Sequence, residues 1–229
     1  MPADSAASAD SSISGTFVVI AHHPEDRYPG PCRPHASVHF QDLSRLWEAV
    51  AVSNRRGHSV LVVPVPELEP FVRGRWEHYE PGWVARDPSF THAHVTALAP
   101  YLPQPTAADL DRVAAIADAT EPFDYVLREV LAFPNGCLHV PPEPAEPFAA
   151  LTHALWEAFP QCPPYQGEYD VAPHVTLDHS SATVTVATTR ALLAGVLPAA
   201  CRADRLELHW YEEGSCHVLA DWKLGRLLR

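Results

Sequence analysis

Two short strings in this chain pair a histidine with a threonine two residues later, HVTA at residues 94–97 and HVTL at residues 174–177. A neutral imidazole can take a proton from water, and a protonated one can give a proton to a leaving oxygen, because the unperturbed pKa of histidine is about 6.5. Threonine hydroxyls can donate hydrogen bonds to the non-bridging oxygens of a phosphate. These residue types favour acid–base chemistry on a phosphodiester and require neither a metal nor another cofactor.

Both strings fall in segments expected to be β-strands, residues 92–98 and residues 173–178. Side chains at positions i and i+2 of a strand point to the same face, so each histidine should project together with its threonine. The repetition indicates two lobes of similar build, with both pairs facing one cleft. A chain with 14 histidines can also hold such strings for packing alone, and this alternative stays open at the level of spacing.

The remaining elements follow from the pattern of apolar residues. A continuous apolar run at residues 60–65 predicts a strand buried on both faces. Strands alternate with helices, but two hairpins break a purely parallel order, so we expect an α+β fold. Helices are predicted at residues 67–79, at 107–119 with Thr106 as N-cap, and at 145–159, and hairpins at residues 123–133 with 137–140 and at 205–211 with 216–223.

The chain of 229 residues suits one domain of two lobes with an N-terminal addition. Residues 1–14 are expected to be a disordered tail. Residues 15–57 are interpreted as an N-terminal extension whose role the residues do not reveal, and residues 58–229 as the two-lobed domain. The oligomeric state is left open.

The charge balance restricts the ligand. Lys and Arg number 16 against 28 Asp and Glu, a formal net charge of −12. Long duplex nucleic acid would be repelled, whereas a small nucleotide or an RNA end remains an acceptable partner. The chain lacks the roughly 18-residue apolar run that a membrane helix needs. Five cysteines without a C-x-x-C pair indicate a reduced, cytoplasmic protein.

The chain resembles the two-histidine (2H) phosphoesterase superfamily, which includes 2′-5′ RNA ligase-like proteins and cyclic phosphodiesterases. The resemblance covers about residues 59–225 and is carried by both His-x-Thr strings together with residues 100–101, 144–148 and 163–165. It implies antiparallel sheets with flanking helices around a central cleft. It also implies that His94 and His174 form the acid–base pair and that Thr96 and Thr176 hold the phosphate.

The leading hypothesis is a metal-independent phosphodiesterase acting on a small nucleotide or a 2′,3′-cyclic phosphate. One alternative is an RNA-end enzyme, either a 2′-5′ ligase or an end-trimming enzyme. Another is a non-catalytic nucleotide-binding module on the same fold. Neither the substrate nor the identity of the acid and the base follows from the residues.

Several neighbours of the two strings have alternative interpretations. Tyr101, Tyr165 and Tyr169 could stack a base or could simply pack in the fold. His92, two residues before the first motif histidine, could join it in binding a metal, or could lie at a strand end near solvent. Asp178 shares the strand face of the second motif and could orient an imidazole or repel phosphate.

Overall fold

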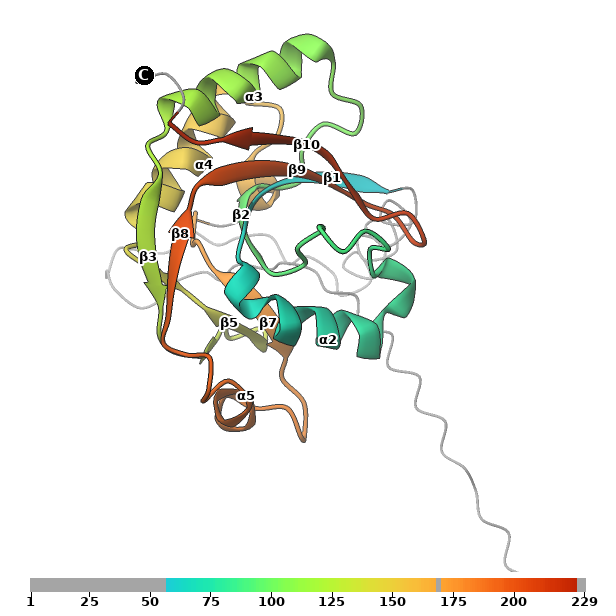
Figure 1. The fold of residues 1–229 in the computed structure, drawn as a ribbon, viewed down its shortest axis with the longest axis vertical. Coiled ribbons are helices and arrows are strands. Elements are labelled where there is room, and N and C mark those ends of the chain that lie inside the picture. Colours follow the sequence, from blue (N-terminus) through green and yellow to red (C-terminus); the bar gives the residue numbers. More distant parts are fainter. Residues whose placement is uncertain (1–56, 168–169, 226–229) are drawn as a thin grey trace, which may run out of the picture.

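The computed structural model describes residues 57–167 and 170–225, which form two antiparallel sheets and four α-helices (Figure 1). The larger sheet has seven strands in the order β10-β9-β1-β2-β7-β5-β4, and the smaller has three in the order β6-β3-β8. The strands are β1 His58–Pro64, β2 His94–Leu98, β3 Phe123–Leu127, β4 Leu131–Ala132, β5 Cys137–Val140, β6 Pro142–Glu143, β7 Val175–His179, β8 Ala199–Ala203, β9 Arg205–Tyr211 and β10 His217–Lys223. This architecture confirms the α+β prediction.

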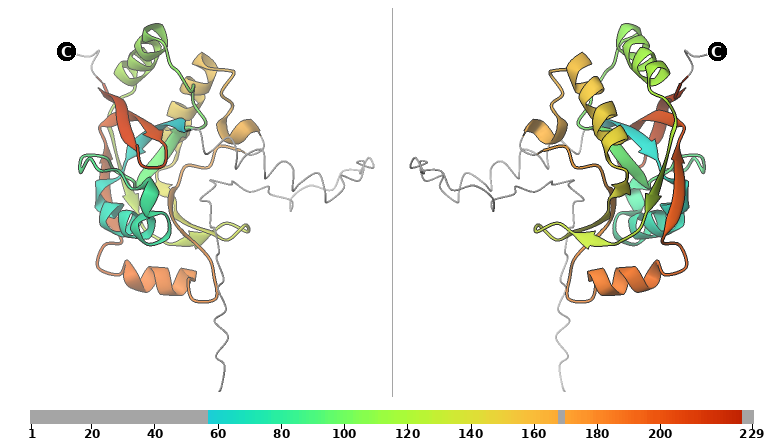
Figure 2. Two further views of the ribbon diagram at one scale, coloured as in Figure 1. Left: turned by 90° about the vertical axis from the view of Figure 1, so that its right-hand side faces the viewer. Right: turned by 90° about the vertical axis from the view of Figure 1, so that its left-hand side faces the viewer.

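The helices cover both faces of the larger sheet. They are α2 Glu69–Tyr79, α3 Ala107–Ala119, α4 Glu146–Ala158 and α5 Val186–Leu192, with short 3-10 turns at Pro66–Leu68, Pro81–Trp83 and Pro164–Gly167. Helix α2 packs against β7 and α4 packs against β2, on opposite sides of the sheet (Figures 1 and 2). Figure 2 also shows α3 beside α4 at one end of the molecule and α5 at the other.

The two strands that carry the His-x-Thr strings each send one face into the main hydrophobic core. Val95 of β2 and Val175 of β7 are fully buried there, together with Leu151 of α4. Because strand side chains alternate between faces, the flanking histidines and threonines must point to the opposite side. The core therefore determines which face of the sheet carries the polar residues.

Two local predictions are confirmed in detail. Helix α3 begins after Thr106, whose hydroxyl accepts a hydrogen bond from the Asp109 N–H at 3.3 Å. The Asp109 carboxylate accepts the Thr106 N–H at 2.9 Å, which completes a capping box. The last hairpin pairs β9 with β10 as expected, with its second strand beginning at His217.

The first hairpin differs from the prediction. Only Leu131–Ala132 pairs with β5. Phe123–Leu127 belongs to the smaller sheet, where it pairs with β6 and β8. Residues 123–133 contain no glycine or proline, so the pattern alone does not mark this break. The change of sheet depends on β8, which lies far along the chain.

The expected tail at residues 1–14 lies outside the described residues, as does the expected extension at residues 15–57 except for Gly57. The division of the chain into these parts stays a prediction. Among the helices of the described ranges, none is long and apolar enough to span a membrane.

Candidate active site

The two His-x-Thr strings meet on neighbouring strands of the larger sheet. Strands β2 and β7 pair antiparallel with Val95 opposite Val175. This register sets His94 across from Thr176, and Thr96 across from His174. All four side chains share one face, and directly opposed residues of an antiparallel pair have Cβ atoms only about 5 Å apart. The structure thus brings the four predicted residues together, each histidine facing the other motif's threonine.

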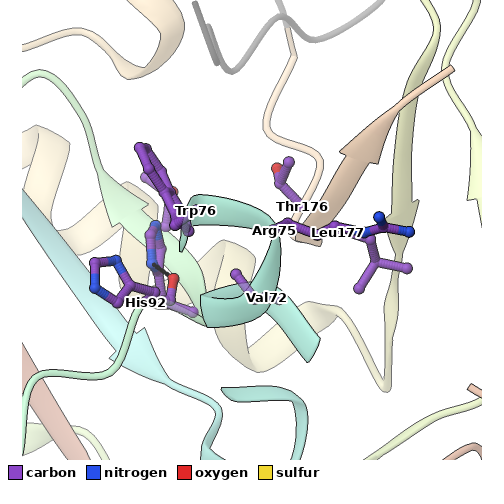
Figure 3. A pocket seen from close by; sticks show the side chains of 8 residues that line it. Val72, Arg75, Trp76, His92, Thr176 and Leu177 are labelled. Atoms are coloured by element: carbon purple, nitrogen blue, oxygen red, sulfur yellow. Dashed lines mark hydrogen bonds between the residues drawn. The ribbon is translucent and has the colours of Figure 1, made fainter. Parts of the chain in front are cut away.

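Helix α2 covers this face and forms a small pocket with it (Figure 3). The pocket is lined by Val72, Arg75 and Trp76 of α2, by His92, by His94 and Thr96 of the first motif, and by Thr176 and Leu177 of the second. The fourth motif residue, His174, lies beside the pocket and is 5% exposed. The pocket side chains of α2 belong to no motif, so their place at the site depends on how this helix packs on the sheet.

Both motif imidazoles make the same kind of hydrogen bond, to the backbone carbonyl oxygen two residues earlier in the chain. His94 Nδ1 lies 2.7 Å from the carbonyl oxygen of His92, and His174 Nδ1 lies 2.6 Å from that of Ala172. A carbonyl oxygen can only accept, so each Nδ1 must carry the proton. In the neutral state, each Nε2 then has a free lone pair. Both histidines are therefore held in the tautomer that can take up a proton through Nε2.

The surroundings favour the neutral form of both imidazoles, but not for identical reasons. Burial lowers the pKa of His94 to about 3, and the neighbouring imidazoles of His209, His92 and His174 add to the effect, against a bond to the His92 carbonyl that raises it. Burial also lowers the pKa of His174, against a bond to the Ala172 carbonyl that raises it. An anion bound between the two rings would oppose these shifts, since a negative charge stabilises imidazolium.

An ion pair between a half-buried guanidinium and a buried carboxylate joins α2 to the second motif strand. Asp178 of β7 is 1% exposed, and its Oδ2 lies 2.8 Å from Nε of Arg75. The guanidinium of Arg75 also lies over the ring of Phe71, 5.0 Å from its centroid. Burial raises the pKa of Asp178, while a backbone bond from His179 and the charge of Arg75 lower it. Asp178 thus holds an arginine of the pocket wall, and no hydrogen bond to His174 is found for it among the described residues.

The three tyrosines have different positions. Tyr101 is 4% exposed and packs edge-on against Phe159 in the core, 5.1 Å between ring centroids, away from the pocket lining. Tyr165 is half-buried, and its hydroxyl donates to the carbonyl oxygen of Ala172 at 3.4 Å, the same oxygen that accepts from the second motif histidine. Tyr169 lies outside the described residues. Base stacking by these side chains stays a prediction, and for Tyr101 it would require an opening of the core.

A histidine that was not singled out lies close to the second motif. His139 of β5 pairs with Thr176 across the sheet, and its ring centroid is 5.5 Å from that of His174. Phe133 stacks on it at 3.7 Å with an interplanar angle of 10°. Burial and His174 lower the pKa of His139 to about 4. No local signal distinguishes His139 from other strand histidines, because its place depends on the β5–β7 register.

His92 occupies neither of the two environments considered from the sequence. Its ring is 1% exposed and lies near those of Trp76 and Phe90, at 5.7 and 4.8 Å between centroids, so it is not a solvated strand end. Its Nε2 accepts the N–H of Ala85 at 3.2 Å, which occupies the lone pair that a metal would need. Within residues 57–167 and 170–225, no group of three His, Cys, Asp or Glu side chains could hold a metal ion.

Comparison with known proteins identifies the family of this chain. Residues 64–215 match the sequence profile of the 2′-5′ RNA ligase superfamily, a span that includes both His-x-Thr strings. A search of curated proteins found no match. Because the profile covers well over half of the chain, the protein belongs to the 2′-5′ RNA ligase superfamily.

Several solved structures are similar at low identity. The E. coli protein LigT, solved with 3′-AMP, is 15% identical, with 73% of this chain and 97% of LigT covered and a TM-score of 0.47. A structure described as a phosphoesterase is 14% identical, with 73% and 97% covered and a TM-score of 0.45. A protein from Thermus thermophilus is 18% identical, with 73% and 98% covered and a TM-score of 0.43.

Proposed function

We propose that this protein is a phosphodiesterase that hydrolyses a small nucleotide, with a nucleoside 2′,3′-cyclic phosphate as the substrate class that fits best. The observation that supports this most directly is the crossed arrangement of His94 with Thr176 and of Thr96 with His174 on one sheet face. Membership of a superfamily of phosphoesterases and a formal net charge of −12 also support a phosphodiesterase with a small substrate. The charge disfavours long polyanionic substrates.

In the proposed reaction, one imidazole removes a proton from water while the water oxygen attacks phosphorus. The bond from phosphorus to the 2′ or 3′ oxygen breaks, and the other imidazole, protonated beforehand, gives its proton to that leaving oxygen. The product is a nucleoside monophosphate with an open ring. Thr96 and Thr176 donate hydrogen bonds to the non-bridging oxygens as charge accumulates on them.

We assign the base to His94 and the acid to His174. Burial and three neighbouring imidazoles disfavour a positive charge on His94 more than the bond to the His92 carbonyl favours it, so this ring is neutral and ready to accept a proton. For His174, burial is the only effect that lowers the pKa. When two titratable groups share a site, the better candidate for the acid is the group whose surroundings disfavour its protonated, charged form less.

The first test is turnover of the four nucleoside 2′,3′-cyclic monophosphates by purified protein in EDTA. We expect hydrolysis to persist in EDTA, because the proposed chemistry uses only side chains of the chain itself. Chromatography of the product isomer identifies the leaving oxygen. No turnover by folded protein would contradict the proposal and favour the binding-module alternative. Activity on 2′-5′-linked oligonucleotides alone, with strong salt dependence, would favour the RNA-end enzyme.

The pH dependence gives an independent test. The acid must be protonated in the free enzyme, and burial has lowered the pKa of His174 below its ordinary 6.5. A phosphodiester substrate keeps one negative charge throughout the neutral range. We therefore expect kcat/KM to rise as the pH is lowered from about 8 to about 5. The base should not lose its function until the pH approaches about 3, the pKa of His94.

The measurement is kcat/KM across this range at constant ionic strength, with stability followed by circular dichroism at each pH. A profile that instead rises steadily from pH 6 to pH 8 would contradict the assignment of a buried imidazolium as the acid.

A further inference from the structure

His92 lies immediately before the first motif and contributes to the site in two ways. Its carbonyl oxygen accepts the Nδ1–H of His94 at 2.7 Å, and its ring forms part of the pocket wall (Figure 3). The ring is anchored through Nε2, which accepts the backbone N–H of Ala85 at 3.2 Å. The carbonyl oxygen of Ala85 in turn accepts a bond from Nη2 of Arg73 at 3.0 Å, so the anchoring segment is itself fastened to α2.

The anchor determines where the proton of the ring resides. A backbone N–H can only donate, so Nε2 of His92 must be an acceptor and the proton must be on Nδ1. That Nδ1 is buried and has no hydrogen-bond partner among the described residues. Buried polar groups in folded proteins are usually paired, because an unmade bond costs free energy. A buried donor without a partner, on a residue of the pocket wall, is available to an acceptor that a ligand brings.

We propose that His92 donates its Nδ1–H to a non-bridging oxygen of the phosphate bound in this pocket. The inference rests on the proposed function, since His94, Thr96 and Thr176 line the same pocket and are assigned to the reacting phosphate. His92 would then be a third imidazole of the site, acting as a neutral donor and exchanging no proton.

The electrostatic surroundings suit a neutral donor. Burial lowers the pKa of His92 to about 3, with further contributions from the charge of Arg73 and from His209. The ring therefore keeps a single proton across the neutral range, and the anchor directs that proton to Nδ1. The alternative is a purely structural role, in which His92 matters only because it caps the N–H of Ala85.

Two substitutions separate these roles, because each keeps one half of the imidazole. His92→Asn places an amide nitrogen near the position of Nδ1, so it keeps the pocket donor and loses the bond from Ala85. His92→Gln reaches the position of Nε2 with its amide oxygen, so it keeps the bond from Ala85 and loses the pocket donor. The probe is inorganic phosphate, with its dissociation constant measured by calorimetry and stability measured by thermal unfolding.

We expect His92→Gln to weaken phosphate binding about tenfold or more, as for the loss of a hydrogen bond to a charged group. His92→Asn should bind phosphate more tightly than His92→Gln, although it should be the less stable of the two. A structural role predicts that the Gln variant matches the wild type in both measurements, and that result would overturn the inference. Equal losses of phosphate affinity in both variants would also overturn it.

A measurement on the wild-type protein covers the case in which neither variant folds. The proton signal of His92 Nδ1–H should move downfield when phosphate is added, and an unmoved signal at saturating phosphate would overturn the inference. Neither experiment requires turnover. A protein that binds phosphate in the expected order and hydrolyses no cyclic nucleotide would contradict the proposed function alone.

Discussion

Replacing either His94 or His174 with alanine should lower kcat/KM for a 2′,3′-cyclic nucleotide by about a hundredfold or more. Each substitution removes one of the two proton transfers, and a positioned acid or base typically contributes about 10²–10⁴-fold. The fold-loss of kcat/KM in the double variant should be smaller than the product of the two single fold-losses, because the two imidazoles act on one transition state. Initial rates at saturating and at low substrate concentration give kcat and KM for each variant.

The chain offers a matched control on β10. His217 Nδ1 bonds the carbonyl oxygen of Ser215 at 2.8 Å, the same local arrangement as in the motif histidines, but its side chain is exposed and is not part of the pocket wall. We expect His217→Ala to keep wild-type kinetics. An unchanged rate in the variant of either motif histidine, with the fold intact, would refute the two-histidine mechanism.

Replacing Arg75 with methionine should destabilise the protein by about 3 kcal/mol, a loss typical of breaking a buried pair from one side. The remaining carboxylate of Asp178 is 1% exposed and would lose the guanidinium that lies 2.8 Å away. Asparagine at position 178 removes the charge that needs a partner. The double variant Arg75→Met/Asp178→Asn should therefore recover most of the lost stability. Urea unfolding of the two single variants and the double variant measures the coupling.

The pH dependence of the Arg75→Met variant has a definite sign. Burial already raises the pKa of Asp178, and without the arginine its folded-state pKa should be higher still. The folded state then binds a proton more tightly than the unfolded state, so stability rises as the pH falls through the folded-state pKa. Below the unfolded-state pKa, about 3.9, the penalty should be absent. A loss of stability that does not change with pH would show that the charge of Asp178 is not its cause.

Some features of this protein depend on residues that are near one another in the chain. The strand period of two places each motif histidine on one face with its threonine, whatever the strand pairs with. The capping box of Thr106 and Asp109 involves residues three positions apart, and helix α3 begins where it predicts. Strands are also found where they were predicted around the two His-x-Thr strings, with β2 beginning at His94 and β7 at Val175. In each case, short-range geometry is sufficient.

Other features depend on contacts between distant segments. The register that sets His94 against Thr176 comes from the pairing of β2 with β7, in which Val95 lies opposite Val175, 80 residues further along the chain. Tyr101 packs in the core against Phe159 of a distant segment, which its polar hydroxyl and neighbouring proline did not reveal.

The sequence by itself therefore determined the residue types and the spacing of the candidate site, two imidazoles and two hydroxyls, and the α+β class of the fold. The tertiary structure decided what surrounds that chemistry. Helix α2 brings Arg75 to the pocket, and the bond from Ala85 gives His92 an unpaired Nδ1–H there. Residue type and local period are properties of a short stretch of chain, whereas burial, register and the partner of a polar atom exist only after distant segments have packed together.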